Sequence, residues 1–145
     1  MRNLMKKDRS RMTAAAMSRI PCDLAIENVQ LVNVFTGEIY PASVDILDGV
    51  VVRIRENCTP ASLAAKETID GEGRYLVPGF IDTHLHVESS LLVPENFGKV
   101  VATWGTTTVV ADPHEIANVV GIKGVEYMLE NGKKSPIRLF QLAPS

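Results

Sequence analysis

The sequence predicts an α/β protein in which a small antiparallel β region precedes a β-α-β-α-β unit of parallel strands. Three observations support this class: turn-rich β-branched segments over residues 24–55, an Asp48-Gly49 pair between two of them, and alternating strand and helix patterns from residue 74 onward. Strands that alternate with helices of about 10–15 residues form parallel sheets with right-handed crossovers. A unit of about three strands and two helices begins either a doubly wound sheet or a (β/α)8 barrel.

The antiparallel region is defined by its turns. Four short runs rich in β-branched residues are predicted to be strands: 24–26, 29–34, 43–47 and 50–55. Thr36-Gly37-Glu38 separates the second run from the third, and Asp48-Gly49 is a strong hairpin signal because both turn positions need positive φ. Alternation of residue types in the last two runs predicts a sheet with one buried face, which makes residues 24–73 part of a small β-domain. Residues 56–68 are predicted to be a surface connection.

The periodicity changes after Gly71, and residues 74–145 are predicted to form the α/β part. Its three strands are predicted at Tyr75–Val87, Thr106–Ala111 and Ile137–Leu142. One helix is predicted from Pro94 to a C-terminal cap at Gly105, and a second from about Ile116 to Asn131. Their apolar stripes are Phe97, Val100, Val101 and Trp104 in the first helix, and Ile122, Val125, Met128 and Leu129 in the second.

Composition and charge limit the classes of partner and compartment. An apolar content of 46% and a charged content of 22% are typical of a globular protein, and a net charge of −2 gives no reason to propose a nucleic acid as partner. Residues 1–23 form a basic N-terminal extension, but Met12–Met17 is too short and too weakly apolar for a secretory signal. No run approaches the roughly 20 apolar residues of a membrane span. Cys22 and Cys58 form neither a zinc pair nor a redox pair, which is ordinary in a reducing compartment. Because the sequence shows neither a secretory signal nor a membrane span, we expect a cytoplasmic protein with no membrane partner.

The residues able to carry chemistry concentrate in the first strand of the α/β part. Side chains alternate along a strand, so Asp82, His84 and His86 share one face with Phe80, and the residues between them share the other. Two imidazoles at i and i+2 near the carboxyl end of a strand can converge on one ion of zinc, manganese or iron. His84 and His86 are therefore candidate metal ligands, and Asp82 is a candidate to orient a histidine ring from behind.

The segment from Val77 to His86 resembles the first-strand signature of the amidohydrolase superfamily. No Gly-x-Gly-x-x-Gly follows this strand, so a dinucleotide-binding doubly wound sheet would lack its phosphate-binding loop. The resemblance implies the start of a (β/α)8 TIM barrel that holds one or two divalent metals. It also implies part of a small β-sandwich domain before the barrel, which matches the position of the predicted hairpins.

Within the superfamily, three further segments are similar to the adenine deaminases: Asn33–Ile39, Val87–Leu92 and Gly105–Asn118. This resemblance implies metal-dependent hydrolytic deamination of adenine, a small-molecule purine base, to hypoxanthine and ammonia in purine salvage and adenine catabolism. It implies Mn2+ or Fe2+, with Zn2+ as a further option, at His84 and His86, and a homo-oligomeric enzyme. The alternative is another cyclic amidohydrolase, similar to imidazolonepropionase or dihydroorotase, against which the segments after the histidines argue.

More polar residues follow the first two predicted strands of the α/β part. Asp112, His114 and Glu115 follow the second strand, on the face of a barrel where catalytic groups gather, so they can contact substrate or a metal. Asp112 can equally cap the next helix, with Glu115 three residues later as in a capping box. Glu88, just past the histidines, either reaches the site or binds backbone in its loop.

The chain ends soon after the third predicted strand, whereas the family that it resembles continues much further. The resemblance implies a bridging carboxylate, further histidines and a catalytic Asp beyond Ser145. We therefore expect a barrel truncated after strand three and a chain that is inactive alone. Such a chain would be a non-catalytic gene product or one part of a split enzyme with a complementary chain.

Overall fold

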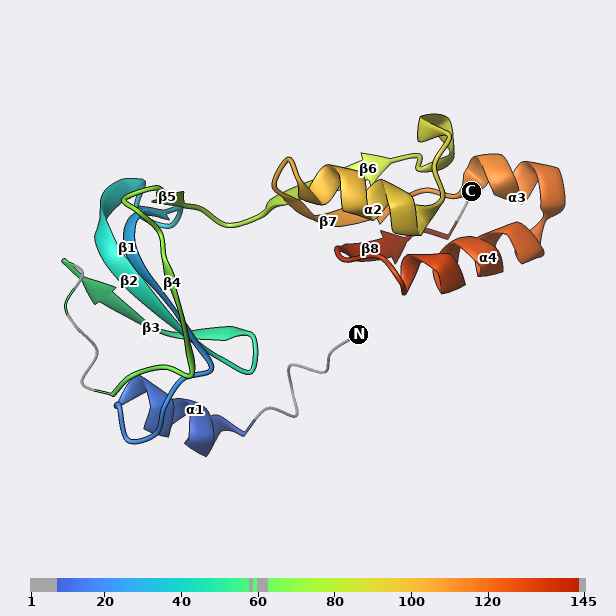
Figure 1. Ribbon diagram of the computed structural model, residues 1–145. Coiled ribbons are helices and arrows are strands. Elements are labelled where there is room, and N and C mark those ends of the chain that lie inside the picture. The colour runs from blue at the N-terminus through green and yellow to red at the C-terminus, as the bar shows by residue number, and fades with distance from the viewer. Residues whose placement is uncertain (1–7, 58, 60–62, 144–145) are drawn as a thin grey trace. The chain divides into compact units, whose positions relative to one another are not determined.

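The computed structural model describes residues 8–57, 59 and 63–143 (Figure 1). The chain forms two compact units, unit 1 (Met1–Pro78) and unit 2 (Gly79–Ser145). Unit 1 contains a mixed sheet with antiparallel hairpins and unit 2 a parallel sheet with helices, so the predicted α/β class is confirmed. No helix in the described part of the chain is long and apolar enough to cross a membrane.

Unit 1 is built on a mixed sheet of five strands. Its elements are α1 (Arg9–Ala16), β1 (Leu24–Asn33), β2 (Glu38–Leu47), β3 (Val50–Glu56), β4 (Glu67–Asp70) and β5 (Tyr75–Leu76). The strand order is β3-β2-β1-β4, with antiparallel pairing among the first three strands, and β5 also pairs with β1. Asp48 and Gly49 have φ angles of 52° and 70°, which confirms the predicted hairpin turn.

Two features of unit 1 differ from the prediction. The predicted connection over 56–68 ends in a strand, β4, which pairs in parallel with β1; its four residues are all exposed, so no buried face marks it in the sequence. The N-terminal extension contributes to the core, because Ala15 of α1 packs with Cys22 and Leu47. Residues 1–7 and Cys58 lie outside the described residues.

A buried ionic cluster holds β2 and β3 together. The Asp45 carboxylate is 2% exposed and lies 2.6 Å from Arg53 Nη2 and 3.2 Å from Arg55 Nε. Arg55 Nη2 also donates to Glu27 Oε1 of β1 at 2.8 Å. Burial alone lowers the pKa of Arg55, but its hydrogen bonds with Asp45 and Glu27 outweigh this effect, so the pKa is raised and the guanidinium stays charged. Strands β1, β2 and β3 are therefore joined by charge as well as by main-chain bonds.

Unit 2 is a parallel three-stranded sheet with its helices as crossovers. Its elements are β6 (Phe80–Leu85), the 3-10 turn η2 (Glu88–Ser90), α2 (Pro94–Ala102), β7 (Thr106–Ala111), α3 (His114–Val120), α4 (Ile122–Gly132) and β8 (Arg138–Gln141). The strand order is β6-β7-β8, and all pairs are parallel. The core between sheet and helices consists of Val87, Phe97, Val109, Ala111, Met128 and Ile137.

The predicted strand Tyr75–Val87 is in fact two strands in two units. Tyr75–Leu76 pairs with β1 of unit 1, whereas Phe80–Leu85 pairs with β7 of unit 2. Pro78, which has no N–H to donate, lies between them. Gly79 opens unit 2, and a Cβ there would overlap the Thr107 side chain. The division after Pro78 lies later in the chain than the junction predicted near residues 70–74.

The predicted helices also needed correction. In α2 the buried positions are Pro94, Phe97 and Gly98, while Val100 and Trp104 of the predicted stripe are exposed. The buried face of α2 is rotated toward Gly98. The helix backbone packs so closely against Ser135 at this point that a Cβ on residue 98 would overlap the Ser135 hydroxyl. Val93 gives α2 no side-chain cap; instead Asn131 Oδ1, from α4, accepts the Glu95 N–H at 2.8 Å.

The second predicted helix is broken into α3 and α4 at Gly121. Its φ of 67° and ψ of −150° form a conformation that essentially only glycine adopts. Val125 and Met128 are buried as predicted, but Ile122 and Leu129 of the same stripe are exposed. The break makes α3 a separate short helix directly after the end of β7.

Candidate metal centre

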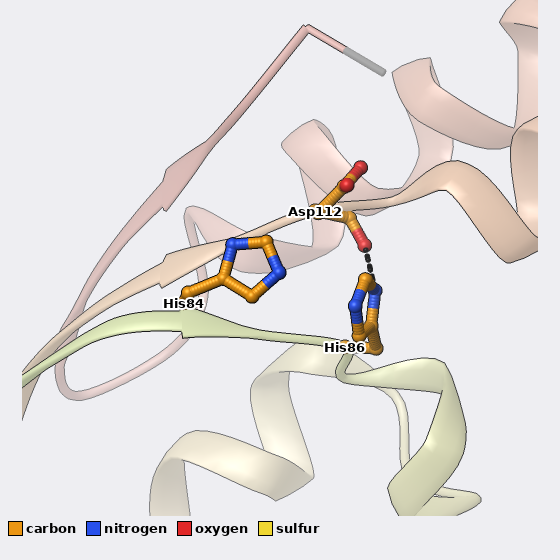
Figure 2. Close-up of side chains that lie close together, drawn as sticks. All are labelled: His84, His86 and Asp112. Carbon is orange, nitrogen blue, oxygen red and sulfur yellow. Dashed lines mark hydrogen bonds between the residues drawn. The ribbon is translucent and has the colours of Figure 1, made fainter. Parts of the chain in front are cut away.

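The candidate metal centre lies at the carboxyl ends of β6 and β7. His84 lies near the end of β6, His86 just after it, and Asp112 directly after β7. Leu85 and Ala111 are partners in the parallel register, so these ends lie side by side. Figure 2 shows His84, His86 and Asp112 gathered at this edge.

Three imidazoles and two carboxylates come close enough to bind a cation. The ring centroids of His84 and His86 are 5.2 Å apart, and those of His86 and His114 are 4.5 Å apart. Two sets each have ligand atoms within 4.8 Å of one another: His84, His86 and Asp112, and His86, His114 and Glu115. His86 belongs to both sets.

The His86 ring is oriented by the main chain. Its Nδ1 lies 3.0 Å from the backbone oxygen of Asp112, as the dashed line in Figure 2 shows. A carbonyl oxygen can only accept a hydrogen bond, so Nδ1 carries the proton in this bond. With this bond in place, the lone pair of the imidazole is on Nε2, the atom that is then free to bind a metal.

Asp112 does not cap the next helix. The first turn of α3 has no side-chain cap, and Pro113 stands at the cap position. The Asp112 Oδ2 atom lies 3.4 Å from His114 Nδ1, and Oδ1 is buried with no hydrogen-bond partner in the described structure. A buried carboxylate oxygen without a partner is costly, which favours a cation at this position.

The loop after His86 is tied to the start of α3 by two hydrogen bonds. Glu88 Oε1 accepts the Ile116 N–H at 3.4 Å, and its Oε2 is buried without a partner in the described structure. Ser89 Oγ donates to Glu115 Oε1 at 2.8 Å. Glu88 Oε1 thus binds backbone, one of the two roles that the sequence left open, while the other role, at the site, stays a prediction for Oε2. Ser89 is a site residue that the sequence analysis missed, and no motif of its own indicated it.

Asp82 Oδ1 accepts the main-chain N–H of His84 at 3.1 Å, next to the proposed ligands. Its predicted role in orienting a histidine ring stays a prediction. Gln141 at the end of β8, also missed, has both amide atoms buried without a partner among the described residues.

The local charge favours a cation. In the described part of the chain no lysine or arginine nitrogen forms an ion pair with Glu88, Asp112 or Glu115; only His114 pairs with Asp112. The carboxylates at this edge therefore lack a protein cation to balance them. Imidazole and carboxylate donors together suit zinc, manganese or iron.

Comparison with known proteins identifies the class to which this fold and site belong. Residues 75–145 match the amidohydrolase family, and this part of the chain belongs to that family. More narrowly, the chain is similar to adenine deaminases, with 47% identity over 132 residues to that of Desulfatibacillum aliphaticivorans and 45% to that of Geobacillus kaustophilus. Each alignment covers 91% of this chain and 22% of the relative, so the chain spans about a fifth of the length of the curated relatives that it matches.

Two solved structures have a similar fold. The L-hydantoinase of Arthrobacter aurescens matches 63% of this chain and 21% of its own, with a TM-score of 0.53 and 28% identity. The D-hydantoinase of a Thermus species matches 81% of this chain and 26% of its own, with a TM-score of 0.60 and 22% identity. The second likeness concerns the fold alone.

Proposed function

We propose that the protein catalyses hydrolytic deamination of adenine to hypoxanthine and ammonia. The observation that carries this proposal is the identity of 45–47% to adenine deaminases over 91% of the chain. Because the chain spans 22% of those relatives, activity and substrate belong to the proposal. The proposed partner is free adenine, the enzyme is a homo-oligomer, and the compartment is the cytoplasm, where a free buried thiol such as Cys22 is ordinary.

Unit 2 is proposed to be the N-terminal portion of a (β/α)8 barrel, and unit 1 part of a small β-sandwich domain. The parallel order β6-β7-β8 with helical crossovers supports the first assignment. In such barrels the catalytic groups gather at the carboxyl ends of the strands. The proposed ligands occupy that edge in unit 2.

His84 and His86 are the proposed ligands of a divalent metal, Mn2+ or Fe2+ in the first place and Zn2+ as a further option. The residues fit such an ion: His86 presents Nε2, and Asp112 has a buried oxygen without a partner in the described structure. The donor set of two imidazoles and one carboxylate is compatible with each of these metals. Asp112 is the proposed third protein donor.

The reaction adds water at C6 of adenine and releases the 6-amino group as ammonia. A divalent ion, when bound, supplies Lewis acidity and makes water a nucleophile near neutral pH. A carboxylate must also carry a proton from the water to the departing amine. Glu88 and Glu115, which lie at the same edge, are proposed to line the substrate side of the centre.

The runner-up is hydrolysis of a cyclic amide. The likeness to the L-hydantoinase structure, at 28% identity, is the observation that favours it. The two functions use the same kind of metal centre and differ in the ring that is cleaved or deaminated. Substrate assays therefore separate them where metal binding does not.

The test is turnover by the purified protein at its natural length. Ammonia release from adenine should require a divalent metal, stop after chelation and return with added Mn2+. His84→Ala should abolish it, whereas Glu126→Gln, an exposed acidic change on α4 outside the centre, should not. Hydrolysis of hydantoin or dihydrouracil without ammonia release from adenine would overturn the proposal in favour of the runner-up.

A further inference from the structure

Asn131 is followed by Gly132, and this is the only Asn-Gly pair in the sequence. Both residues lie in the last turn of α4, where their carbonyl oxygens accept the N–H groups of Lys134 and Ser135, each at 3.1 Å. Asn131 Oδ1 also accepts the Glu95 N–H at 2.8 Å and so caps the amino end of α2. One asparagine side chain therefore holds the end of α4 to the beginning of α2.

Nothing in the described structure requires a glycine at position 132. Its φ is not positive, and a Cβ there would lie 3.5 Å from Leu139 Cδ2, which is an ordinary van der Waals contact. Glycine inside a helix is less favourable than alanine. What this glycine does provide is a main-chain nitrogen that no side chain shields, directly beside the Asn131 amide.

Two Asp-Gly pairs, Asp48-Gly49 and Asp70-Gly71, have the same spacing but a less reactive side chain. Hydrogen bonds from the Glu72 main chain and the Asn28 side chain lower the pKa of Asp70, so this carboxyl group is ionised at neutral pH. The Asp48 carboxylate forms an ion pair with Arg11. A carboxylate repels an attacking lone pair, whereas the neutral amide of asparagine does not, and asparagine is a thermolabile residue.

We propose that Asn131 is a site of spontaneous deamidation, and that the contact between α4 and α2 controls its rate. The Gly132 main-chain nitrogen attacks Asn131 Cγ and forms a new C–N bond, which closes a cyclic imide. The bond from Cγ to the side-chain nitrogen breaks, and that nitrogen leaves as ammonia with the proton of the Gly132 N–H. Water then opens the imide, at Cγ to give aspartate or at the main-chain carbonyl to give isoaspartate.

The fold opposes ring closure in two ways. The helical backbone holds the Gly132 nitrogen in the main-chain hydrogen-bond pattern, and the bond to Glu95 holds the Asn131 side chain against α2. Closure therefore requires the last turn of α4 to open, and helix ends are among the parts of a protein that open most readily. This inference depends neither on the proposed substrate nor on the proposed metal.

The two products differ in their effect on α2. Aspartate at position 131 keeps an oxygen for the Glu95 N–H and adds negative charge at the amino end of a helix, where such charge is favourable. Isoaspartate inserts Cβ into the main chain of α4 and displaces the acceptor. Hydrogen exchange of the Glu95 amide should therefore stay slow in the aspartate form, for which Asn131→Asp is the reference, and become about 5-fold faster in the isoaspartate form.

The experiment follows deamidation of the purified protein at neutral pH in water enriched in heavy oxygen, with and without urea, by peptide mass spectrometry. The folded protein should react more slowly than the urea-unfolded protein by about 5-fold or more, the factor that corresponds to the usual contribution of one helix cap. Asn118, exposed on α3 and followed by Val119, is the internal control and should stay unmodified, because the branched valine side chain shields its main-chain nitrogen. Gly132→Ala should suppress the reaction in both conditions.

Equal rates in the folded and the urea-unfolded protein would overturn the proposal, as would an intact Asn131 amide in both conditions. Deamidation of Gly132→Ala at the original rate would also overturn it, because ring closure through an unshielded nitrogen would then not be the route. Circular dichroism reports whether Gly132→Ala is folded, and the urea comparison within the unaltered protein decides the matter if it is not.

Discussion

Asp45→Asn removes one negative charge from between two arginines while it keeps the shape of the side chain. Asp45 is 2% exposed and Arg55 is 6% exposed, so neither group can exchange its partner for bulk water. The amide of asparagine can still accept one hydrogen bond but cannot balance the guanidinium of Arg55. The cost of the variant is therefore mainly the cost of a buried charge that has lost its counterion.

Breaking a buried ion pair by removing one partner costs about 3–5 kcal/mol. The lower end applies in this protein for two reasons: Glu27 remains as a partner of Arg55, and the Arg53 side chain is 22% exposed and can be hydrated. We expect a loss of about 3 kcal/mol, which is roughly a 100-fold shift in the opening equilibrium of the hairpin. This is a large part of the total stability of about 5–15 kcal/mol that is usual for a domain.

Hydrogen exchange of the β2 and β3 amides measures this opening directly. The matched control is Glu72→Gln, which removes the same charge from an exposed ion pair with Arg74 in the same unit. Exposed pairs contribute about 0–1 kcal/mol, so the control should change amide protection little. Protection of β2 and β3 in Asp45→Asn within 1 kcal/mol of the original would refute the reasoning; that limit is about the largest effect of an exposed pair.

Three further predictions concern the scaffold. Asn131→Ala should destabilise unit 2 by about 1 kcal/mol in urea unfolding, because the Glu95 N–H loses its acceptor, whereas Asn131→Asp should retain most of the stability. Gly79→Ala should lower the melting temperature through a cost of about 1–3 kcal/mol, since the new methyl group overlaps Thr107; an unchanged melting temperature would contradict the packing at this position. Burial raises the pKa of Cys22, so the stability present below the thiol pKa of the unfolded chain, about 8.5, should fall as pH rises above it, and Cys22→Ser should remove that slope.

Elements with a strong local signal were predictable from the sequence. The strand Thr106–Ala111 was predicted with its observed bounds, because an unbroken β-branched run allows little else. The Asp48-Gly49 turn follows from the φ angles that the pair tolerates. β4 could not be predicted: its four exposed residues carry no burial pattern, and it is a strand only because β1 lies beside it.

Single glycines account for the errors in the helices. Gly98 offers no side chain to a hydrophobicity pattern, yet it is buried, so the predicted stripe of α2 was rotated away from it. Gly121 lies in an apolar segment and looks tolerable within a helix, but its ψ of −150° ends one. The position of Gly98 is decided by its contact with Ser135, and that of Gly121 by its dihedral angles. Neither property can be read from the hydrophobicity pattern.

Some features of the candidate site could be predicted from the sequence, and others could not. Strand alternation was enough to place His84 and His86 on one side of a strand, and the structure brings their rings to 5.2 Å. The bond from His86 to the Asp112 main chain and the bond from Ser89 to Glu115 depend on how two loops meet after their strands end. No periodicity extends into such loops, so these contacts required the structure.

The acceptor that orients the His86 ring is the main-chain oxygen of Asp112. A side-chain substitution cannot remove this acceptor. Any substitution at position 112 alters the carboxylate and leaves this carbonyl group in place, because the carbonyl belongs to the peptide bond with Pro113. A substitution at position 112 can therefore change the charge of the centre while His86 keeps the same hydrogen bond and the same tautomer. Chemical synthesis with an ester in place of that amide weakens the acceptor and is the direct way to alter one property without the other.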